Sequence, residues 1–220
     1  IGSGEIYNPV LLEYLLDTKI PLLLSSGMSS ISDLDNVINQ VVKKSIPFGI
    51  FQCSSSYPTP PELWGLEILS GLRERYRCPV GLSDHSGYIY AGLAATALGA
   101  DFIEAHVTFD KRMFGPDVSS SVTISELKQL VNGSKAIRTS LNNKKDKDLL
   151  VSSTKGLKKT FGRSLALVSD LPPGAKLSKK DLTLKKPGTG IVYGDINKVI
   201  GRSLKAGKNA NKLLTWDDLE

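Results

Sequence analysis

The sequence predicts an α/β protein whose first part is half of an eightfold β/α (TIM) barrel. Short apolar runs alternate four times with segments of helical periodicity, which indicates a parallel sheet. The runs lack polar alternation, as expected for strands covered on both faces. A doubly wound sheet would show the same alternation, but no Gly-x-Gly-x-x-Gly motif follows any run. Polar clusters at the carboxyl end of each run favour the barrel, because its strand ends meet at one mouth.

Four apolar runs are predicted to be strands: 20–24, 46–53, 79–82 and 102–107. The first predicted helix covers 31–42, where apolar residues recur at helical spacing behind the serine pair 29–30 as N-cap. The second is predicted to begin at Pro60, because proline is favoured in the first turn of a helix. Its apolar stripe runs over 63–72.

The remaining predicted helices carry their own end signals. The alanine-rich segment 90–98 forms the third helix, and Gly99 is its expected C-cap. Thr123 and Glu126 have the spacing of a capping box, which predicts the start of the last helix.

The charge changes along the chain and indicates a domain boundary. The whole chain has 28 Lys and Arg against 22 Asp and Glu, a net charge of +6. Residues 1–143 have eleven basic and fourteen acidic residues, whereas 144–220 have seventeen and eight. We therefore predict a partial barrel domain over 1–143, a solvated linker over 144–155 and a small β-rich domain over 156–220.

Composition excludes several classes of protein. The hydrophobic fraction is 40% and no apolar run approaches the roughly 18 residues of a membrane span. Cys53 and Cys78 form neither a disulfide framework nor a four-ligand zinc site, so a reducing, cytoplasmic compartment is expected. Because the chain opens on Ile1, inside a motif, we expect it to be a piece of a longer chain.

Small and polar residues cluster at the carboxyl edge of each predicted strand and at the start of the chain. The clusters are 2–5, 25–27, 54–57, 83–85 and 104–106. Serine hydroxyls and glycine amides near helix starts suit a phosphate or a carboxylate. A single serine at a turn is commonly only a cap, but five clusters on one rim favour a binding site.

The chain has only two histidines, and both end neighbouring predicted strands. A single histidine would be interpreted as a hydrogen-bonded rim residue. Two on strands about 4.8 Å apart can share one divalent ion, so His85 and His106 predict a metal site left open for oxygen ligands. Asp84 and Glu104 are expected to point away and to serve as structural groups or as hydrogen-bond partners of the residues that hold ligands. Asp117 lies on a loop suited to a substrate contact.

Six motifs in order resemble the sialic acid synthase family. They are Ile1-Gly2-Ser3-Gly4-Glu5, 24–28, 53–60, 81–85, 103–108 and 115–117. The C-terminal part resembles that family's SAF (antifreeze-like, β-clip) domain. The matching segments there are 170–174, 177–182 and 186–190. The resemblance covers essentially the whole chain and implies the barrel from the end of strand 4 to helix 8.

The resemblance assigns roles to individual residues. It implies that His85 and His106 hold a divalent metal, Mn²⁺ or Mg²⁺. Three serines are implied to bind phosphoenolpyruvate: Ser3, Ser25 and Ser83. Contacts with the sugar are implied for Glu5, Ser55, Tyr57, Asp117 and Lys186. Catalytic roles are implied for Glu5, Tyr57 and Asp117.

The activity implied is a metal-dependent condensation of phosphoenolpyruvate with an N-acyl hexosamine, such as N-acetylmannosamine, to give a nonulosonic acid and phosphate. The resemblance also implies a domain-swapped homodimer in which the SAF domain covers the partner's barrel. It places three barrel strands and a lysine before Ile1, so the isolated chain is expected to be inactive.

Two residues depart from the family pattern. Gln52 stands where many members have histidine, and this difference changes little in the activity that we expect. Lys186 stands where many bacterial members have arginine. Lysine keeps the positive charge but cannot make the two parallel hydrogen bonds of a guanidinium group. The expected effect is on sugar specificity or affinity.

Other functions are weighed against the synthase. The basic C-terminal part has no interleaved aromatic residues, so we expect no nucleic-acid partner, and a positive lid that attracts anionic substrate ranks higher. We expect no membrane partner. A non-catalytic carbohydrate-binding or scaffold homologue is the alternative to the enzyme. An aldolase ranks lower because no lysine for a Schiff base lies at a predicted strand end.

Overall fold

The computed structural model describes residues 1–220, apart from the side chains of Ser153 and Lys155. The chain divides into two compact units, Ile1–Lys144 and Lys145–Glu220. Each unit buries an apolar core of its own. Among the described residues, no helix combines the length and the apolar character needed to cross a membrane.

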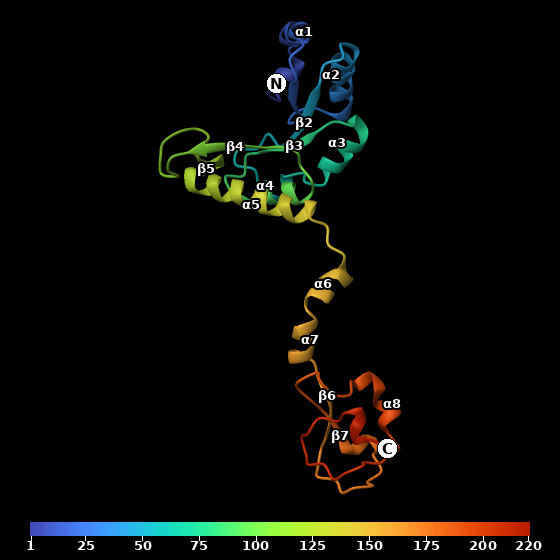
Figure 1. Cartoon of the computed structure of the whole chain (residues 1–220). Helices are drawn as coiled ribbons and strands as arrows, with labels where there is room; N and C mark the ends of the chain where they lie inside the picture. Colours follow the sequence, from blue (N-terminus) through green and yellow to red (C-terminus); the bar gives the residue numbers. More distant parts are fainter. The chain divides into compact units, whose positions relative to one another are not determined.

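A parallel sheet of five strands lies in the first unit (Figure 1). In spatial order the strands are β1 (Leu22–Ser25), β2 (Phe48–Cys53), β3 (Val80–Asp84), β4 (Ile103–Thr108) and β5 (Ser121–Thr123). The register pairs Ser25 with Phe51 and Cys53 with Ser83, so the carboxyl ends of β1, β2 and β3 lie beside one another. All four predicted strands are present, and Ser83 and Asp84 are the last residues of β3 rather than residues that follow it.

Helices precede, connect and follow these strands. They are α1 (Pro9–Thr18), α2 (Ile31–Lys43), α3 (Ile68–Tyr76), α4 (Tyr90–Ala97) and α5 (Ile124–Asn142). The predicted N-caps are observed: Ser30 caps α2 in a capping box with Asp33, and Thr123 caps α5 in one with Glu126. The C-cap of α4 is Leu98 rather than the expected Gly99, which follows it with a φ of +88°. The apolar stripe of α2 is buried against the sheet in one core cluster.

The prediction for the second helix was wrong at its start. Proline opens only a single 3₁₀ turn, Pro61–Leu63, and α3 begins at Ile68. Between them Gly65 has a φ of +64°, a left-handed conformation that ends helical geometry. Leu69 and Leu72 are buried as the stripe required, because they lie within α3.

Two elements of the first unit were not foreseen. Helix α1 begins at Pro9 and is capped by Asn8, whose side chain accepts a hydrogen bond from the Leu11 amide. Strand β5 is only three residues long and pairs with His106, Val107 and Thr108 of β4. Short strands carry little periodicity, so a sequence pattern does not reveal them.

The second unit is a small β-rich fold with short helices. Two helices, α6 (Lys147–Ser153) and α7 (Lys155–Phe161), occupy most of the segment predicted as a linker. Strands β6 (Ser164–Leu167) and β7 (Leu182–Lys185) pair antiparallel, and α8 covers Ile196–Val199. The 3₁₀ turns η4 (Lys179–Asp181) and η6 (Trp216–Asp218) each begin with a capping box. The core contains Leu165, Leu167, Leu177, Ile191, Val199, Leu204, Leu214 and Leu219.

Candidate active site

A polar cavity of about 280 Å³ lies at the carboxyl ends of the strands in the first unit. Its lining comes from the start of the chain and from all four of the predicted strands or the loops after them. The lining residues are Ile1, Gly2, Ser3, Leu23, Ser25, Phe51, Cys53, Tyr57, Ser83, His85, Glu104 and His106. Six residues predicted for the site are thus brought together: Ser3, Ser25, Tyr57, Ser83, His85 and His106.

The two histidines face each other across adjacent strands. His85 directly follows β3 and His106 lies in β4, with ring centroids 5.1 Å apart. Nδ1 of His85 lies 2.9 Å from the Ser54 carbonyl oxygen. Because a carbonyl can only accept, Nδ1 carries the hydrogen and Nε2 keeps its lone pair. The Tyr57 hydroxyl donates to that Nε2 at 3.1 Å.

His85 is 5% exposed, and its neighbours set its protonation. Burial disfavours the imidazolium, but contacts with Cys53 Sγ, at 4.0 Å from Nδ1, and with the Ser54 carbonyl outweigh it and raise the pKa of His85. Burial also opposes a Cys53 thiolate, yet hydrogen bonding from His85, Ser25 and Ser83 lowers the pKa of Cys53. The pKa of Tyr57 is raised, first by burial and then by nearby negative charge, so its hydroxyl remains a donor.

Glu104 belongs to the cavity, so the expectation that it points away was wrong, whereas the expected supporting role agrees with its bond to Ser83. It lies two residues before His106, so both side chains are on the same face of β4. Its Oε1 accepts a 2.6 Å hydrogen bond from Ser83 Oγ. Its spacing of two residues from His106 in a predicted strand was the sequence signal that could have placed Glu104 in the site. Asp84 is buried elsewhere and accepts from the amide and hydroxyl of Ser86.

The other predicted residues lie at the rim or elsewhere. Asp117 Oδ2 is 3.7 Å from His106 Nδ1. Ser55 approaches Gly27, where an added Cβ would lie 2.7 Å from Ser55 Oγ, so a larger residue would not fit between the loops. Glu5 accepts from Asn8 Nδ2 at 2.8 Å and does not line the cavity. Lys186 lies in the second unit after β7, with Nζ 5.5 Å from the centre of the Phe161 ring.

The donor set fits an open metal site with two imidazole ligands. Within the described part of the chain, no three His, Cys, Asp or Glu side chains converge as a closed site would require. His85 presents Nε2 with its hydrogen on the opposite nitrogen, as in a histidine whose tautomer is fixed for coordination. Oxygens of substrate or water would complete the coordination of a divalent ion held there.

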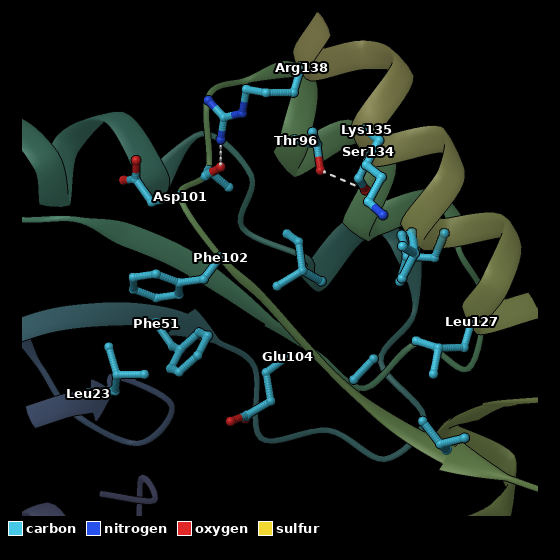
Figure 2. A pocket seen from close by; sticks show the side chains of 16 residues that line it. Leu23, Phe51, Thr96, Asp101, Phe102, Glu104, Leu127, Ser134, Lys135 and Arg138 are labelled. Carbon is cyan, nitrogen blue, oxygen red and sulfur yellow. Dashed lines mark hydrogen bonds between the residues drawn. The ribbon is translucent and has the colours of Figure 1, made fainter. Parts of the chain in front are cut away.

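A larger cavity of about 770 Å³ adjoins this one (Figure 2). Leu23, Phe51 and Glu104 line both cavities. Several polar groups in the larger cavity are engaged with the protein itself, since Arg138 donates to the Ala100 carbonyl and Thr96 donates to Ser134. Figure 2 shows Glu104 pointing towards the side of the sheet that carries Leu23 and Phe51, away from Leu127 of α5. The smaller cavity, with its converging histidines and serines, is therefore the candidate site.

Comparisons with known proteins agree with this arrangement. The NeuB family matches residues 1–146 and the SAF domain matches residues 162–220. N,N'-diacetyllegionaminic acid synthase of Legionella pneumophila is 33% identical over 227 residues, covering 100% of this chain and 63% of that protein. N-acetylneuraminate-9-phosphate synthase of Homo sapiens is 33% identical over 208 residues, covering 93% of this chain and 57% of that protein. The chain thus spans less than two thirds of the length of these relatives.

Solved structures support the fold. N-acetylneuraminic acid synthetase from Leptospira borgpetersenii, solved with citrate, superposes with a TM-score of 0.65 at 32% identity, over 72% of this chain and 57% of that one. A spore coat polysaccharide biosynthesis protein from Bacillus subtilis superposes with a TM-score of 0.62 at 25% identity, over 100% of this chain and 66% of that one. The predicted barrel portion and SAF region are confirmed, as is the resemblance to sialic acid synthases. The chain belongs to the NeuB family.

Proposed function

We propose that this chain carries the C-terminal part of a nonulosonic acid synthase, which condenses phosphoenolpyruvate with an N-acyl hexosamine and releases phosphate. The single observation that supports this most is the cavity in which two facing imidazoles meet three serine hydroxyls. Relatives named as legionaminic, pseudaminic and N-acetylneuraminate-9-phosphate synthases support the reaction class and leave the sugar open.

We assign one group of site residues to binding the anionic phosphoenolpyruvate and another to the aldehyde of the sugar. Ser3 and Ser25 offer hydroxyls to the anionic groups of phosphoenolpyruvate. Ser83 donates to Glu104, so it must exchange that partner before it can donate to an anion. His85 and His106 would hold a divalent ion, Mn²⁺ or Mg²⁺, which supplies positive charge towards the sugar aldehyde and its developing alkoxide.

The reaction forms one carbon–carbon bond and expels one phosphate. C3 of phosphoenolpyruvate attacks the open-chain aldehyde, water adds at C2, and phosphate leaves the resulting tetrahedral centre. Tyr57 and Asp117, which lie beside the two histidines, are placed to orient the sugar. We assign sugar contacts also to Glu5 and Ser55, and to Lys186 from the second unit of a partner in a domain-swapped homodimer, as the family resemblance implies.

The test is phosphate release from phosphoenolpyruvate with N-acetylmannosamine and Mn²⁺. It is run on this chain and on a longer polypeptide that includes the barrel strands expected before Ile1. We expect release by the longer protein, its loss with a chelator, and its recovery when Mn²⁺ is restored. Absence of release with every N-acyl hexosamine, together with retained sugar binding, would establish the non-catalytic alternative instead.

A further inference from the structure

Lys111 lies on the loop between β4 and β5, three residues after β4 ends. Its ammonium donates to two backbone carbonyls, that of Gly87 at 2.6 Å and that of Ser121 at 2.5 Å. Gly87 comes two residues after His85, and Ser121 is the register partner of His106 in the sheet. One side chain therefore joins the segments that lie beside both histidines of the candidate site.

The groups around Lys111 suit a cation. Its Nζ lies 3.9 Å from Glu126 Oε2 and 5.6 Å from the centre of the Tyr88 ring, and its side chain is 37% exposed. A carboxylate and an aromatic face each favour a nearby ammonium. An ammonium has three hydrogens to donate, and hydrogen bonds from a charged donor are stronger than those between neutral groups. A neutral side chain of the same length could therefore not replace the two bonds to the carbonyls.

Close packing between the two joined segments is a second, independent observation. Gly87 has a φ of +74°, and a Cβ added to it would lie 2.3 Å from the Ser119 carbonyl oxygen. Only glycine suits both the conformation and the space. Ser119 belongs to the 3₁₀ turn η3 (Val118–Ser120), which leads directly into β5. The bonds of Lys111 therefore fix the relative position of two segments that already touch.

Ser121 connects Lys111 to Asp117. The Ser121 carbonyl accepts from Lys111, and the Ser121 hydroxyl donates to the Asp117 carbonyl at 2.6 Å. The Ser120 amide donates to that same Asp117 carbonyl at 3.0 Å. The side chain of Asp117 then reaches the rim of the site, with Oδ2 at 3.7 Å from His106 Nδ1. A continuous series of contacts thus runs from Lys111 through Ser121 to the Asp117 carboxylate.

We propose that Lys111 is a positioning residue, which holds Asp117 in place for the sugar substrate. The inference rests on the proposed synthase function, in which Asp117 orients the sugar. Lys111 acts through Ser121 and not by contact with a substrate. Phosphoenolpyruvate is assigned to serines on other segments, so the effect of Lys111 is confined to the sugar.

The first experiment compares Lys111→Met with wild type in the longer polypeptide of the phosphate-release assay. Methionine keeps the length of the side chain and removes the donors. We expect the KM for N-acetylmannosamine to rise about three- to tenfold, the range expected for one hydrogen bond, while the KM for phosphoenolpyruvate stays the same. A poorly folded variant would instead lower kcat and leave both KM values unchanged. An unchanged KM for the sugar in a folded variant would overturn the proposal.

Two further variants sharpen the comparison. Lys128→Met is the matched control, because it makes the same substitution at an exposed position of α5 and should change neither KM. Ser121→Ala removes only the hydroxyl that bonds the Asp117 carbonyl, so it should raise the KM for the sugar in the same way. If circular dichroism shows that Lys111→Met fails to fold, Ser121→Ala decides, and an unchanged KM there rejects the proposal.

Amide hydrogen exchange in the 220-residue chain separates this inference from the proposed function, because it needs no activity. Lys111→Met should speed exchange of the Ser120 amide about three- to tenfold, since that amide donates to the Asp117 carbonyl. Unchanged exchange would reject the role of Lys111 even if the longer protein releases phosphate. Faster exchange together with an inactive wild-type protein would reject the proposed function and retain the contact between the loops.

Discussion

The position of the hydrogen on the His85 imidazole determines which of its nitrogens can bind a metal ion. The Ser54 carbonyl keeps the hydrogen of His85 on Nδ1, and this leaves Nε2 as the nitrogen that can coordinate. The Tyr57 hydroxyl donates to that same atom. A divalent ion held there, as proposed, would compete with Tyr57 for one lone pair, which gives two predictions about metal binding.

Substituting either histidine should remove metal binding without unfolding the chain. We expect His85→Ala and His106→Ala each to lower Mn²⁺ affinity at least tenfold, measured by electron paramagnetic resonance of free Mn²⁺. The neighbours of His85 raise its pKa above the usual 6.5. Protons should therefore compete with Mn²⁺ for the His85 imidazole as the pH falls from 7 to 6. Wild-type affinity in either variant would show that the ligand assignment is wrong.

Tyr57→Phe should have the opposite effect on the metal. Loss of the hydroxyl removes a hydrogen bond that metal binding must break, so we expect Mn²⁺ affinity to rise about two- to tenfold. The same electron paramagnetic resonance titration measures it. Tyr14→Phe, on the exposed side of α1, is the control and should change nothing. A fall in affinity with Tyr57→Phe would mean that the phenol assists binding.

At the scale of elements, capping boxes mark where several helical segments begin. The boxes at Ser30 and Thr123 start α2 and α5 in the first unit. In the second unit the segments 177–182 and 214–219 share the pattern Leu-Ser/Thr-x-x-Asp-Leu, and each forms a capped 3₁₀ turn. The local hydrogen bonds are the same in both units, so these starts can be predicted from short sequence patterns.

Ser30→Ala should reduce stability by removing a cap. The Asp33 amide loses its acceptor, and we expect the free energy of unfolding to fall by about 1 kcal/mol in urea denaturation. Ser32→Ala is the matched control, because Ser32 is exposed in the first turn of the same helix. A difference of less than a few tenths of a kcal/mol between the two variants would contradict a stabilising cap.

Asp101 links α3 to the amino ends of two strands. It accepts from Arg73 at 2.8 Å and from the Val80 amide at 2.9 Å. Burial opposes its charge, but these bonds prevail and lower its pKa. A lowered pKa stabilises the fold above the unfolded value near 3.9, and this contribution disappears as pH falls below it.

Asp101→Asn should therefore destabilise the protein in a pH-dependent way. We expect a loss of about 0.5–1 kcal/mol at pH 7, limited by the partial exposure of the pair, in urea unfolding. The difference from wild type should shrink at pH 3. Asp17→Asn, in the more exposed pair with Lys44, is the control. An equal difference at both pH values would exclude the ionised carboxylate as the cause.

Sequence patterns identified the strands and most helix starts, and they failed where tertiary contacts decide. The helix predicted from Pro60 was interrupted by Gly65, whose positive φ lets the chain pack against Gln52. Strand β5 exists because three residues pair with the end of β4. Glu104 joined the site because strand geometry places it on the face of His106. These contacts join residues that are far apart in the sequence, so local propensities do not predict them.

At the scale of the whole molecule, the chain has two units of different charge, and the boundary between them lies between Lys144 and Lys145. Residues 1–143 carry a slight acidic excess and 144–220 a strong basic one. Each unit has a separate hydrophobic core. We therefore expect the units to unfold separately, with the chain around this boundary as the accessible backbone.

Limited trypsin digestion should cut first between Lys144 and Lys159. The segment is lysine-rich, and its described residues are mostly exposed. We expect two stable fragments near the sizes of the two units, identified by mass spectrometry. Arg73 and Arg138 are the internal comparison, because both are engaged in hydrogen bonds within the first unit. Early cleavage at these arginines would contradict two independently stable units.

The sequence by itself determined the alternation of strands and helices, the change in charge near residue 143, and the two histidines at neighbouring strand ends. These features depend on local periodicity and on the spacing of residues along the chain. Only the tertiary structure decided which nitrogen of His85 is free, that Glu104 bonds Ser83, and that Ser26 donates to Gln52. Those outcomes depend on distances between atoms on different elements, which a one-dimensional pattern does not specify.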